Sequence, residues 1–136
     1  VLLLLSLALV APGFFATQCN LTGKWINDLG SNMTIEAVSR KGDFAGSYFT
    51  AVTASNNKIQ VSPLLGYLNN TDTQPVFGFT VQWNFTESVT VFTGQCFVDA
   101  EGKEVLKTMW LLRSHVDHIT DDWKATRVGT NNFTRL

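Results

Sequence analysis

Short turn-forming clusters interrupt this chain at regular intervals, and this spacing limits the possible folds more than any other feature of the sequence. The clusters are Asp28–Gly30, Arg40–Gly42, Ser55–Asn57, Asn69–Asp72, Thr86–Ser88 and Asp99–Gly102, and a longer polar stretch runs from Ser114 to Asp122. The eight segments that these breaks leave are rich in Val, Ile, Thr, Phe and Trp, which favour β-strands. Many short strands joined in this way indicate a β-sandwich or a β-barrel.

The fifth segment shows the strand pattern most clearly. Large apolar residues occupy every second position, as in a half-buried strand; they are Phe77, Phe79, Val81, Trp83 and Phe85. The eighth segment, Trp123–Phe133, is more polar but has no helical period, and we expect no helix after residue 16. Short connections favour an up-and-down order, which can close on itself. The sequence therefore predicts an all-β fold, an eight-stranded antiparallel up-and-down β-barrel with room for one small ligand.

Residues 1–16 differ from the rest of the chain because they carry no charge and are almost entirely apolar. A transmembrane helix needs about 20 apolar residues, and Pro12 and Gly13 interrupt this run early. We interpret the segment as a secretory signal peptide, truncated at its start, that ends on small residues. The alternative is a buried N-terminal strand or helix. The preferred interpretation predicts a barrel domain over residues 17–136 and an extracellular location.

The chain has two cysteines, Cys19 and Cys96, and secretion would expose them to an oxidising environment. An even number of cysteines in a secreted chain indicates a disulfide, and two free thiols are the alternative. The formal net charge is −1, and neither sign of charge dominates. The sequence therefore points neither to nucleic acid nor to a membrane surface as a partner.

The sequence contains little that suggests catalysis. It has no G-x-S-x-G motif, no phosphate-binding loop and no H-E-x-x-H motif. His115 and His118 lie with three aspartates, Asp117, Asp121 and Asp122, in the last polar stretch. These side chains are of metal-binding type, but we interpret the stretch as a solvated loop and predict no metal site. We expect a binding protein and not an enzyme.

Neutral polar residues gather near the predicted strand ends and alternate with aromatic residues. The polar residues are Asn27, Ser31, Tyr48, Thr50, Thr53, Ser55, Thr86, Ser88 and Thr90. The aromatic residues are Trp83, Phe85, Phe92, Trp110 and Trp123. Each alone is explained by a turn, a strand hydroxyl or core packing. Together they predict an apolar pocket with a neutral polar floor, which is the composition of a small-molecule site.

Five stretches of the chain closely resemble the avidin family of biotin-binding proteins. They are Leu21–Thr34, Phe77–Phe85, Val91–Cys96, Glu104–Arg113 and Asp121–Gly129, and the similarity extends over almost all of Cys19–Leu136. The resemblance implies an avidin-like barrel with Cys19 bonded to Cys96. It also implies a homotetramer in which Trp123 closes the ligand site of a neighbouring subunit.

The resemblance assigns each part of biotin to residues of this chain. Biotin's ureido oxygen would accept hydrogen bonds from Asn27, Ser31 and Tyr48, and its ureido nitrogens would donate to Thr50 and Asn131. Thr90 would contact the ring sulfur. The carboxylate would be bound by Thr53, Ala54, Ser55, Thr86 and Ser88. The walls would be formed by Trp83, Phe85, Phe92, Trp110 and Leu112, and Leu29 also belongs to the implied ligand-binding set. Biotin is expected as a bound ligand, and no catalytic cofactor is implied.

Two departures from the family pattern fall on the predicted carboxylate contacts. Ser55 replaces a threonine and Thr86 replaces a serine, so both positions keep a hydroxyl.

Outside the site, Asn-x-Ser/Thr motifs make five asparagines candidates for glycosylation; they are Asn20, Asn32, Asn69, Asn84 and Asn132. Asn69 lies in the most loop-like sequence and is the preferred candidate.

Two other functions remain open from the sequence. Gly23-Lys24-Trp25 matches the short G-x-W motif of lipocalins, which are also small β-barrels that carry ligands. That motif does not account for the polar set around Asn27 and Tyr48. The second alternative is a structural protein that uses an avidin-like barrel without its ligand, against which the complete polar set argues.

Overall fold

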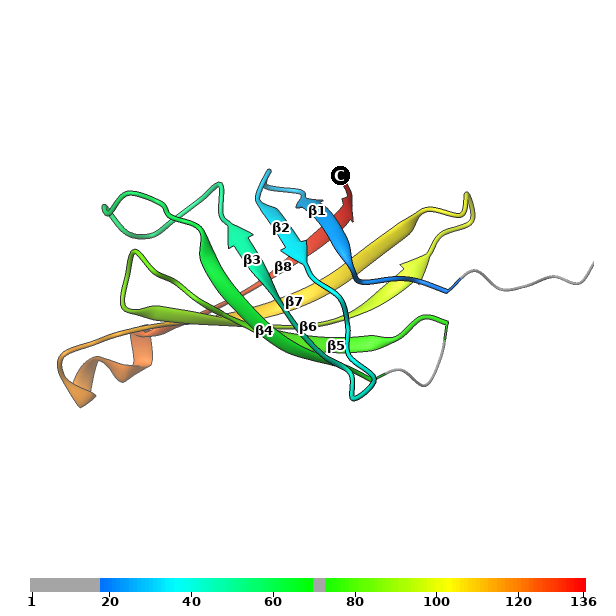
Figure 1. Ribbon diagram of the computed structural model, residues 1–136. Helices are drawn as coiled ribbons and strands as arrows, with labels where there is room; N and C mark the ends of the chain where they lie inside the picture. The colour runs from blue at the N-terminus through cyan, green and yellow to red at the C-terminus, as the bar shows by residue number, and fades with distance from the viewer. Residues whose placement is uncertain (1–17, 70–72) are drawn as a thin grey trace, which may run out of the picture.

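Eight antiparallel strands close into a barrel in the computed structural model of this chain, which describes residues 18–69 and 73–136 (Figure 1). The strands are β1 (Gly23–Asn27), β2 (Asn32–Ile35), β3 (Asp43–Phe49), β4 (Ser62–Asn69), β5 (Val76–Gln82), β6 (Ser88–Val98), β7 (Glu104–Ser114) and β8 (Thr126–Arg135). Each strand pairs with the next along the chain, and β8 returns to pair with β1. The predicted up-and-down barrel is confirmed.

The alternation seen in the sequence separates the inside of the barrel from the outside. On β5, Phe77, Phe79 and Val81 are at most 5% exposed, as the period of two predicts. Phe79 stacks on Phe92 of β6 with ring centroids 4.6 Å apart. These rings fill the middle of the barrel, so the space for a ligand lies toward one end only.

Most of the predicted turns join strands as expected, and glycine permits two of the tightest. Gly30 follows β1 with a φ of 85°, and Gly42 precedes β3 with a φ of 92°, values that side chains with a Cβ rarely adopt. The β3–β4 connection is longer than the predicted turn at Ser55–Asn57. It extends from Thr50 to Val61 and overhangs one end of the barrel (Figure 1).

The opposite end of the barrel is closed by Trp25 and the N-terminal arm. Trp25 is fully buried and donates its indole N–H to the backbone oxygen of Leu21 at 2.8 Å. The Arg135 guanidinium lies 3.9 Å from the centroid of the Trp25 ring and donates to a Glu104 carboxylate oxygen at 2.7 Å. The same carboxylate accepts the backbone N–H of Asn20 at 2.6 Å.

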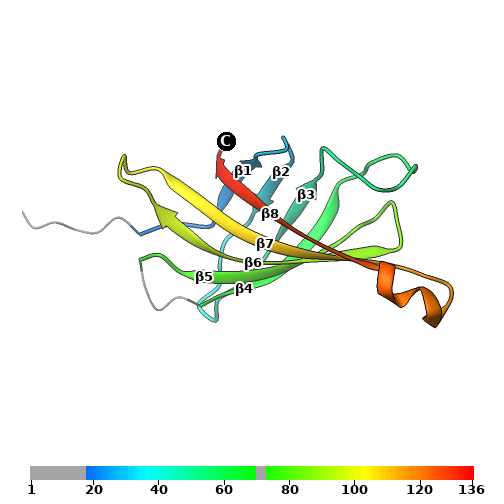
Figure 2. The same ribbon diagram turned by 180° about the vertical axis from the view of Figure 1, so that it is seen from behind.

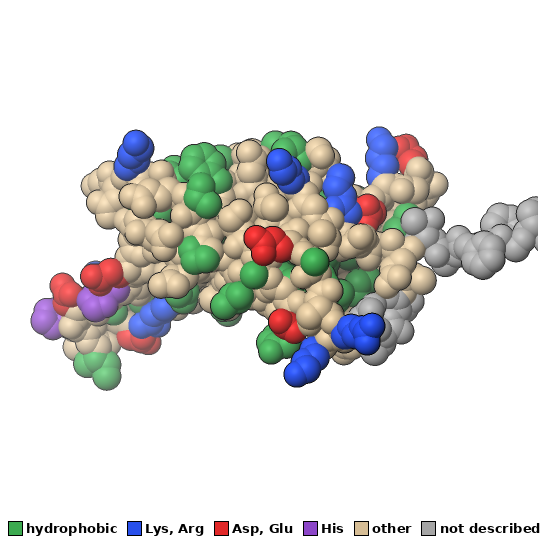
Figure 3. Space-filling view, in the orientation of Figure 1, with side chains coloured by type: hydrophobic (Ala, Val, Ile, Leu, Met, Phe, Trp, Pro, Cys, Tyr) green, Lys and Arg blue, Asp and Glu red, His purple; other side chains and the backbone are tan. Residues whose placement is uncertain are grey.

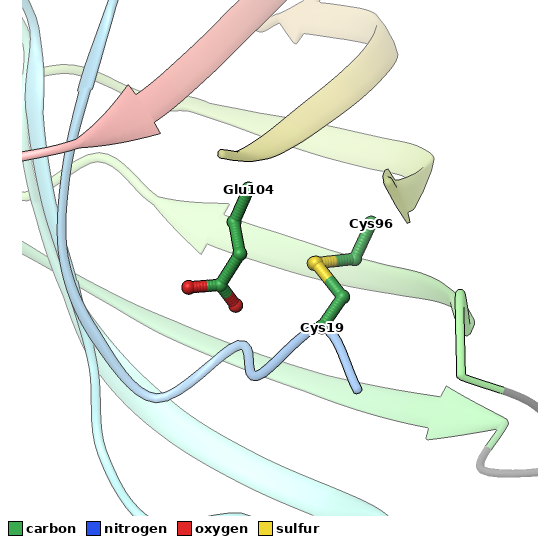
Figure 4. Close-up of side chains that lie close together, drawn as sticks. All are labelled: Cys19, Cys96 and Glu104. Carbon is green, nitrogen blue, oxygen red and sulfur yellow. A yellow bond between two sulfur atoms is a disulfide. The ribbon is translucent and has the colours of Figure 1, made fainter. Parts of the chain in front are cut away.

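A disulfide joins Cys19 of this arm to Cys96 of β6, as predicted. Figure 4 shows the Glu104 carboxylate beside the bonded sulfurs. Within residues 18–69 and 73–136, this is the one cluster of metal-ligand type whose atoms lie close together. Both sulfurs are committed to the disulfide and the carboxylate to Arg135 and Asn20, so these groups form a structural clamp.

The expectation of no helix is wrong at one place. A 3-10 helix, η1 (Ile119–Lys124), follows β7 and projects beyond the mouth of the barrel (Figures 1 and 2). Arg113 at the end of β7 donates to Asp122 of η1 at 2.6 Å and holds the helix against the strand. Trp123, expected at the start of the eighth strand, lies in η1 instead.

Residues 1–17 lie outside the described part of the chain, so the proposed signal peptide and the domain boundary at residue 17 stay predictions. None of the helices in the described ranges has the length and apolar character needed to cross a membrane.

Candidate functional site

A cavity of about 350 Å³ opens at the end of the barrel under the long β3–β4 connection. Every residue that the sequence analysis placed in the ligand site lines this cavity, with the exception of Trp123. The cavity lies on the inner faces of strands β3, β6, β7 and β8, above the stacked phenylalanines. Its residues divide into a polar floor, apolar walls and a rim of hydroxyl groups.

Three hydrogen-bond donors meet at the floor. The Asn27 side-chain oxygen accepts the backbone N–H groups of Leu29 and Ser31, at 3.0 and 2.9 Å, which fixes the orientation of the amide. Its nitrogen donates to the Tyr48 hydroxyl at 3.1 Å, so the Tyr48 proton is available to another acceptor. The Ser31 hydroxyl accepts the N–H of Ala51 at 2.9 Å and also keeps its proton for another acceptor.

Tyr48 remains a neutral donor because it is buried. It is 3% exposed and packs against the rings of Trp83, Phe92 and Phe133. Burial raises the pKa of Tyr48, and hydrogen bonds with Ser31 and Asn27 offset only part of that rise. The floor therefore presents donors without a negative charge.

Two hydrogen-bond acceptors line the same cavity as these donors. Asn131 donates its side-chain nitrogen to the Asp28 carboxylate at 2.8 Å, which directs its side-chain oxygen to other partners. Thr50 donates its hydroxyl proton to the backbone oxygen of Val52 at 2.6 Å and accepts the backbone N–H of Val52 at 3.2 Å, which leaves one lone pair for an incoming N–H. Asn131 and Thr50 are 5% and 7% exposed, so the two acceptors are held in a largely dry site.

The walls are aromatic and aliphatic. Trp83 donates its indole N–H to the Thr90 hydroxyl at 2.8 Å, which leaves the Thr90 proton free for the cavity. Trp110 packs over Gly129 of the neighbouring strand, where a Cβ would collide with the indole ring. The remaining wall residues are Leu29, Phe85, Phe92 and Leu112. Together they form apolar walls suited to a small bicyclic or aromatic ring.

Hydroxyl groups and backbone form the rim. Thr53 and Ser55 accept the backbone N–H groups of Ser55 and Asn57, at 2.9 and 3.0 Å, so their protons remain available. Asn57 ties the β3–β4 connection to the β5–β6 turn by donating to the backbone oxygen of Phe85 at 2.7 Å. Ala54, Thr86 and Ser88 complete the predicted part of the rim. These groups suit an acceptor-rich end of a ligand.

Three lining residues were not predicted: Val52, Ser114 and Arg127. The sequence contains a signal for the last of these. Positions 127, 129, 131 and 133 share one face of β8, and Phe133 and Asn131 are both buried in the barrel. Extending that alternation from Asn131 toward the mouth places Arg127 on the inner face.

Trp123 lies apart from the cavity of its own chain. It is 82% exposed on η1, and its neighbour Ile119 is 91% exposed. A single barrel leaves both side chains uncovered, so Trp123 does not close the site of its own subunit.

The two histidines lie on the segment that carries Trp123, where Figure 3 shows them beside acidic side chains at the projecting end of the molecule. His115 lies between two carboxylates, with Nε2 3.0 Å from Asp117 and Nδ1 3.6 Å from Glu87. Its backbone N–H also donates to the backbone oxygen of Glu87 at 3.0 Å. These contacts fasten the β7–η1 segment to the β5–β6 turn.

The residues that line the cavity are suited to binding a ligand and not to catalysing a reaction. Among its lining residues, all in the described ranges, only Tyr48 and Arg127 have ionisable side chains. Neither stands beside a partner that would make it a general base or a nucleophile. The site presents neutral donors, neutral acceptors and aromatic walls to a ligand that fits them.

Comparison with known proteins agrees with this geometry. The sequence model of the avidin family matches residues 15–136. The chain belongs to the avidin family. It is 71% identical to avidin of Gallus gallus over 137 residues, which cover 99% of this chain and 90% of that protein. The G-x-W motif at Gly23–Trp25 therefore belongs to an avidin-family barrel and not to a lipocalin.

Solved structures show the same relationship. The structure of Xenavidin superposes with a TM-score of 0.86 at 55% identity and covers 88% of this chain and all of that one. An X-ray structure of a biotin binding protein from chicken gives a TM-score of 0.85 at 60% identity, with 88% of this chain and 99% of that chain covered. The avidin-family prediction is confirmed for both sequence and fold.

Proposed function

We propose that this avidin-family protein binds biotin in the barrel cavity, one molecule per subunit, without catalysis. The observation that carries the proposal is the arrangement of the cavity floor. Three donors, from Asn27, Ser31 and Tyr48, line the same cavity as two acceptors, from Thr50 and Asn131. A cyclic urea presents the complementary pattern, because its carbonyl oxygen lies between two N–H groups.

The remaining parts of biotin fit the rest of the cavity. The fused rings occupy the slot between Trp83, Phe92 and Trp110, and the Thr90 hydroxyl faces the ring sulfur. Trp110 Nε1 is buried without a partner among the described residues, so this wall also holds an unused donor. The aliphatic tail leads to the rim, where Thr53, Ala54, Ser55, Thr86 and Ser88 bind the carboxylate.

Preorganisation favours tight binding of such a ligand. The Asn27 amide, the Ser31 hydroxyl and the Asn131 amide are each oriented by a hydrogen bond made within the protein. Little ordering entropy is therefore lost when the ligand enters. Polar groups that are buried without partners are costly, so a ligand that satisfies all of them is strongly favoured over one that does not.

We further propose that the protein is an extracellular homotetramer that sequesters free biotin. Residues 1–16 have the composition of a signal peptide, and the disulfide suits an oxidising compartment. All five candidate asparagines for glycosylation are exposed: Asn20, Asn32, Asn69, Asn84 and Asn132. Trp123 is 82% exposed and does not line its own cavity, which supports a role in covering the site of another subunit.

Isothermal titration calorimetry with biotin, combined with light scattering, tests these proposals. We expect saturation at one biotin per chain and a particle of four chains. A protein that is folded by circular dichroism but takes up no biotin would refute the proposed ligand. A monomer that binds biotin would refute the proposed assembly and leave the ligand in place.

A further inference from the structure

One cation stands at the mouth of a cavity that is otherwise neutral. Arg127 of β8 pairs with Leu112 of β7, and both residues line the cavity. Arg127 is exposed, and it is the one residue of the lining with a charge at neutral pH. The ligand contacts predicted from the sequence give this guanidinium no role.

The charge on Arg127 is not neutralised by the surrounding protein. Within residues 18–69 and 73–136, no ion pair or hydrogen bond of its guanidinium is found, whereas its neighbour Arg113 binds Asp122 on the outside of the barrel. Glu87, the acidic residue of the β5–β6 turn, is paired with His115. The Asp28 carboxylate lies near the floor, where it accepts the side-chain N–H of Asn131. Arg127 is therefore an unpaired positive charge at the mouth.

Arg127 lies at the rim of the cavity, where the tail of a bound ligand would end, and not at the floor, where its rings would lie. Inward residues of β8 succeed one another from the buried Phe133, through Asn131 at the polar floor, to Arg127 at the rim. On β7, Ser114 also lies at the rim, directly opposite Ser88 of β6. A ligand whose rings occupy the floor directs its tail toward these groups.

We propose that Arg127 is a specificity-determining residue that makes the site select ligands with a free carboxylate over ligands whose carboxyl group is blocked as an amide. The inference rests on the proposed function. The rim hydroxyls can donate to the oxygen of a carboxylate or of an amide, so they do not exclude the amide. The guanidinium adds an attraction between opposite charges that only the ionised carboxylate receives.

A direct competition tests this selectivity. The purified assembled protein is incubated with an equimolar excess of biotin and of biotinamide, its primary amide, and the bound ligands are released by denaturation and quantified by chromatography. The two ligands are nearly isosteric but differ both in charge and in one hydrogen-bonding group, so the charge contribution of Arg127 is obtained from the change of the bound ratio between the wild type and an Arg127 variant. We expect the wild-type protein to be enriched in biotin.

In the variant Arg127→Gln the ratio should fall by about two- to fivefold, the range expected for a solvent-exposed charge interaction. Arg127→Lys should keep most of the preference. The matched control is Lys107→Gln, which removes an equal charge from an exposed position of β7 that is not in the cavity, and its ratio should equal that of the wild type.

The salt dependence of the bound ratio is a second test, and it uses only the wild-type protein. Raising the ionic strength to about 1 M should lower the wild-type ratio, because the Debye length shrinks to about 3 Å. A ratio in Arg127→Gln equal to that of the wild type, or a wild-type ratio insensitive to salt, would overturn the inference while biotin binding stands. A wild-type protein that retains neither ligand would instead overturn the proposed function.

Discussion

A single hydroxyl at the cavity floor illustrates how the site is built. The Tyr48 oxygen already accepts a hydrogen bond from Asn27, so the hydroxyl does not donate to Asn27 and its proton can be donated to the ligand. Tyr48→Phe should weaken biotin binding by about 1–3 kcal/mol, because the ureido oxygen then lacks a donor in a dry site. Asn27→Ala should weaken binding at least as much.

The matched control for Tyr48→Phe is Tyr67→Phe, since Tyr67 is 68% exposed on β4. Dissociation rates of radiolabelled biotin from the three proteins provide the measurement. Equal rates for wild type and Tyr48→Phe would place the ligand away from this floor.

The burial of Tyr48 also has a consequence at alkaline pH. Burial raises the pKa of this phenol above its ordinary value of about 10. Below that value both folded and unfolded chains keep the proton. As the pH rises past about 10, the unfolded chain releases its proton first, so the free energy of unfolding falls.

Guanidinium unfolding of the wild type and of Tyr48→Phe, each on both sides of pH 10, checks this linkage. The fall in stability should be smaller in Tyr48→Phe than in the wild type. Biotin release should stay constant up to about pH 10, because the donor keeps its proton over that range. A parallel alkaline fall in the two proteins would assign the effect to other groups.

Individual residues also show how far sequence reasoning reaches. The residues of the floor, walls and rim were identified through similarity to the avidin family, and the structure gathers them in one cavity. Val52 and Ser114 were missed because their place depends on how β7 and the β3–β4 connection meet at the mouth, whereas the alternation along β8 could have indicated Arg127. The meeting of β7 with that connection is a property of the closed barrel.

At the level of elements, the mouth depends on one connection that is long and largely exposed. Asn57 anchors the β3–β4 connection to Phe85 through a 2.7 Å hydrogen bond. Asn57→Ala should leave the floor intact but loosen the connection. Biotin should dissociate faster, by up to about tenfold for the loss of one hydrogen bond.

The neighbouring Asn56→Ala is the matched control, since Asn56 is exposed and does not line the cavity. Stopped-flow or radiolabel dissociation rates compare the two variants. If Asn57→Ala released biotin no faster than Asn56→Ala, the connection would not act as a retaining element.

The N-terminal arm is the second element with a separable role. Its disulfide closes a long loop, with a sequence separation of 77, at the end of the barrel away from the cavity. Replacing both cysteines by serine should lower the free energy of unfolding by about 4 kcal/mol in the chain-entropy description. Biotin dissociation should change little, because Trp25 and Arg135 still close that end.

Guanidinium unfolding of the ligand-free protein measures the first effect, and release of bound biotin measures the second. An unchanged unfolding midpoint would show that the clamp formed by Arg135 and Glu104 is sufficient without the disulfide. A large increase in the dissociation rate would show that the two ends of the barrel are coupled.

Some elements of the fold could be predicted from the sequence and others could not. The strands were predictable because alternation on β5 and glycine-containing turns are local signals. The 3-10 helix η1 was not, because six residues without a buried face carry no period. Its position is set by the contact of Arg113 with Asp122 and by His115 on Glu87, which are tertiary interactions.

On the scale of the whole molecule, a single barrel leaves a row of apolar side chains exposed on its outer surface. Val91, Leu111 and Val128 lie side by side on the outer faces of β6, β7 and β8, and each is at least 43% exposed. Met109 and Leu65 extend this outer face. Contiguous apolar surface of this kind marks an interface, which supports an assembly of several barrels.

In the proposed tetramer, Trp123 connects assembly to ligand binding. It is 82% exposed on η1 and does not line its own cavity, so it is accessible to another subunit. Trp123→Lys should shift the tetramer toward dimers or monomers and accelerate biotin release together. A central interface tryptophan contributes on the order of 2 kcal/mol or more, so both effects should be large. In turn, biotin should stabilise the assembled form by mass action.

Light scattering and biotin dissociation rates on the same preparation test this link. Trp123→Phe, which keeps an aromatic ring at the position, is the matched control and should be intermediate in both measurements. Each barrel folds around its own core, so circular dichroism of Trp123→Lys should remain that of a β-barrel. If Trp123→Lys stayed tetrameric and released biotin at the wild-type rate, no subunit would complete the site of another, and each cavity would act alone.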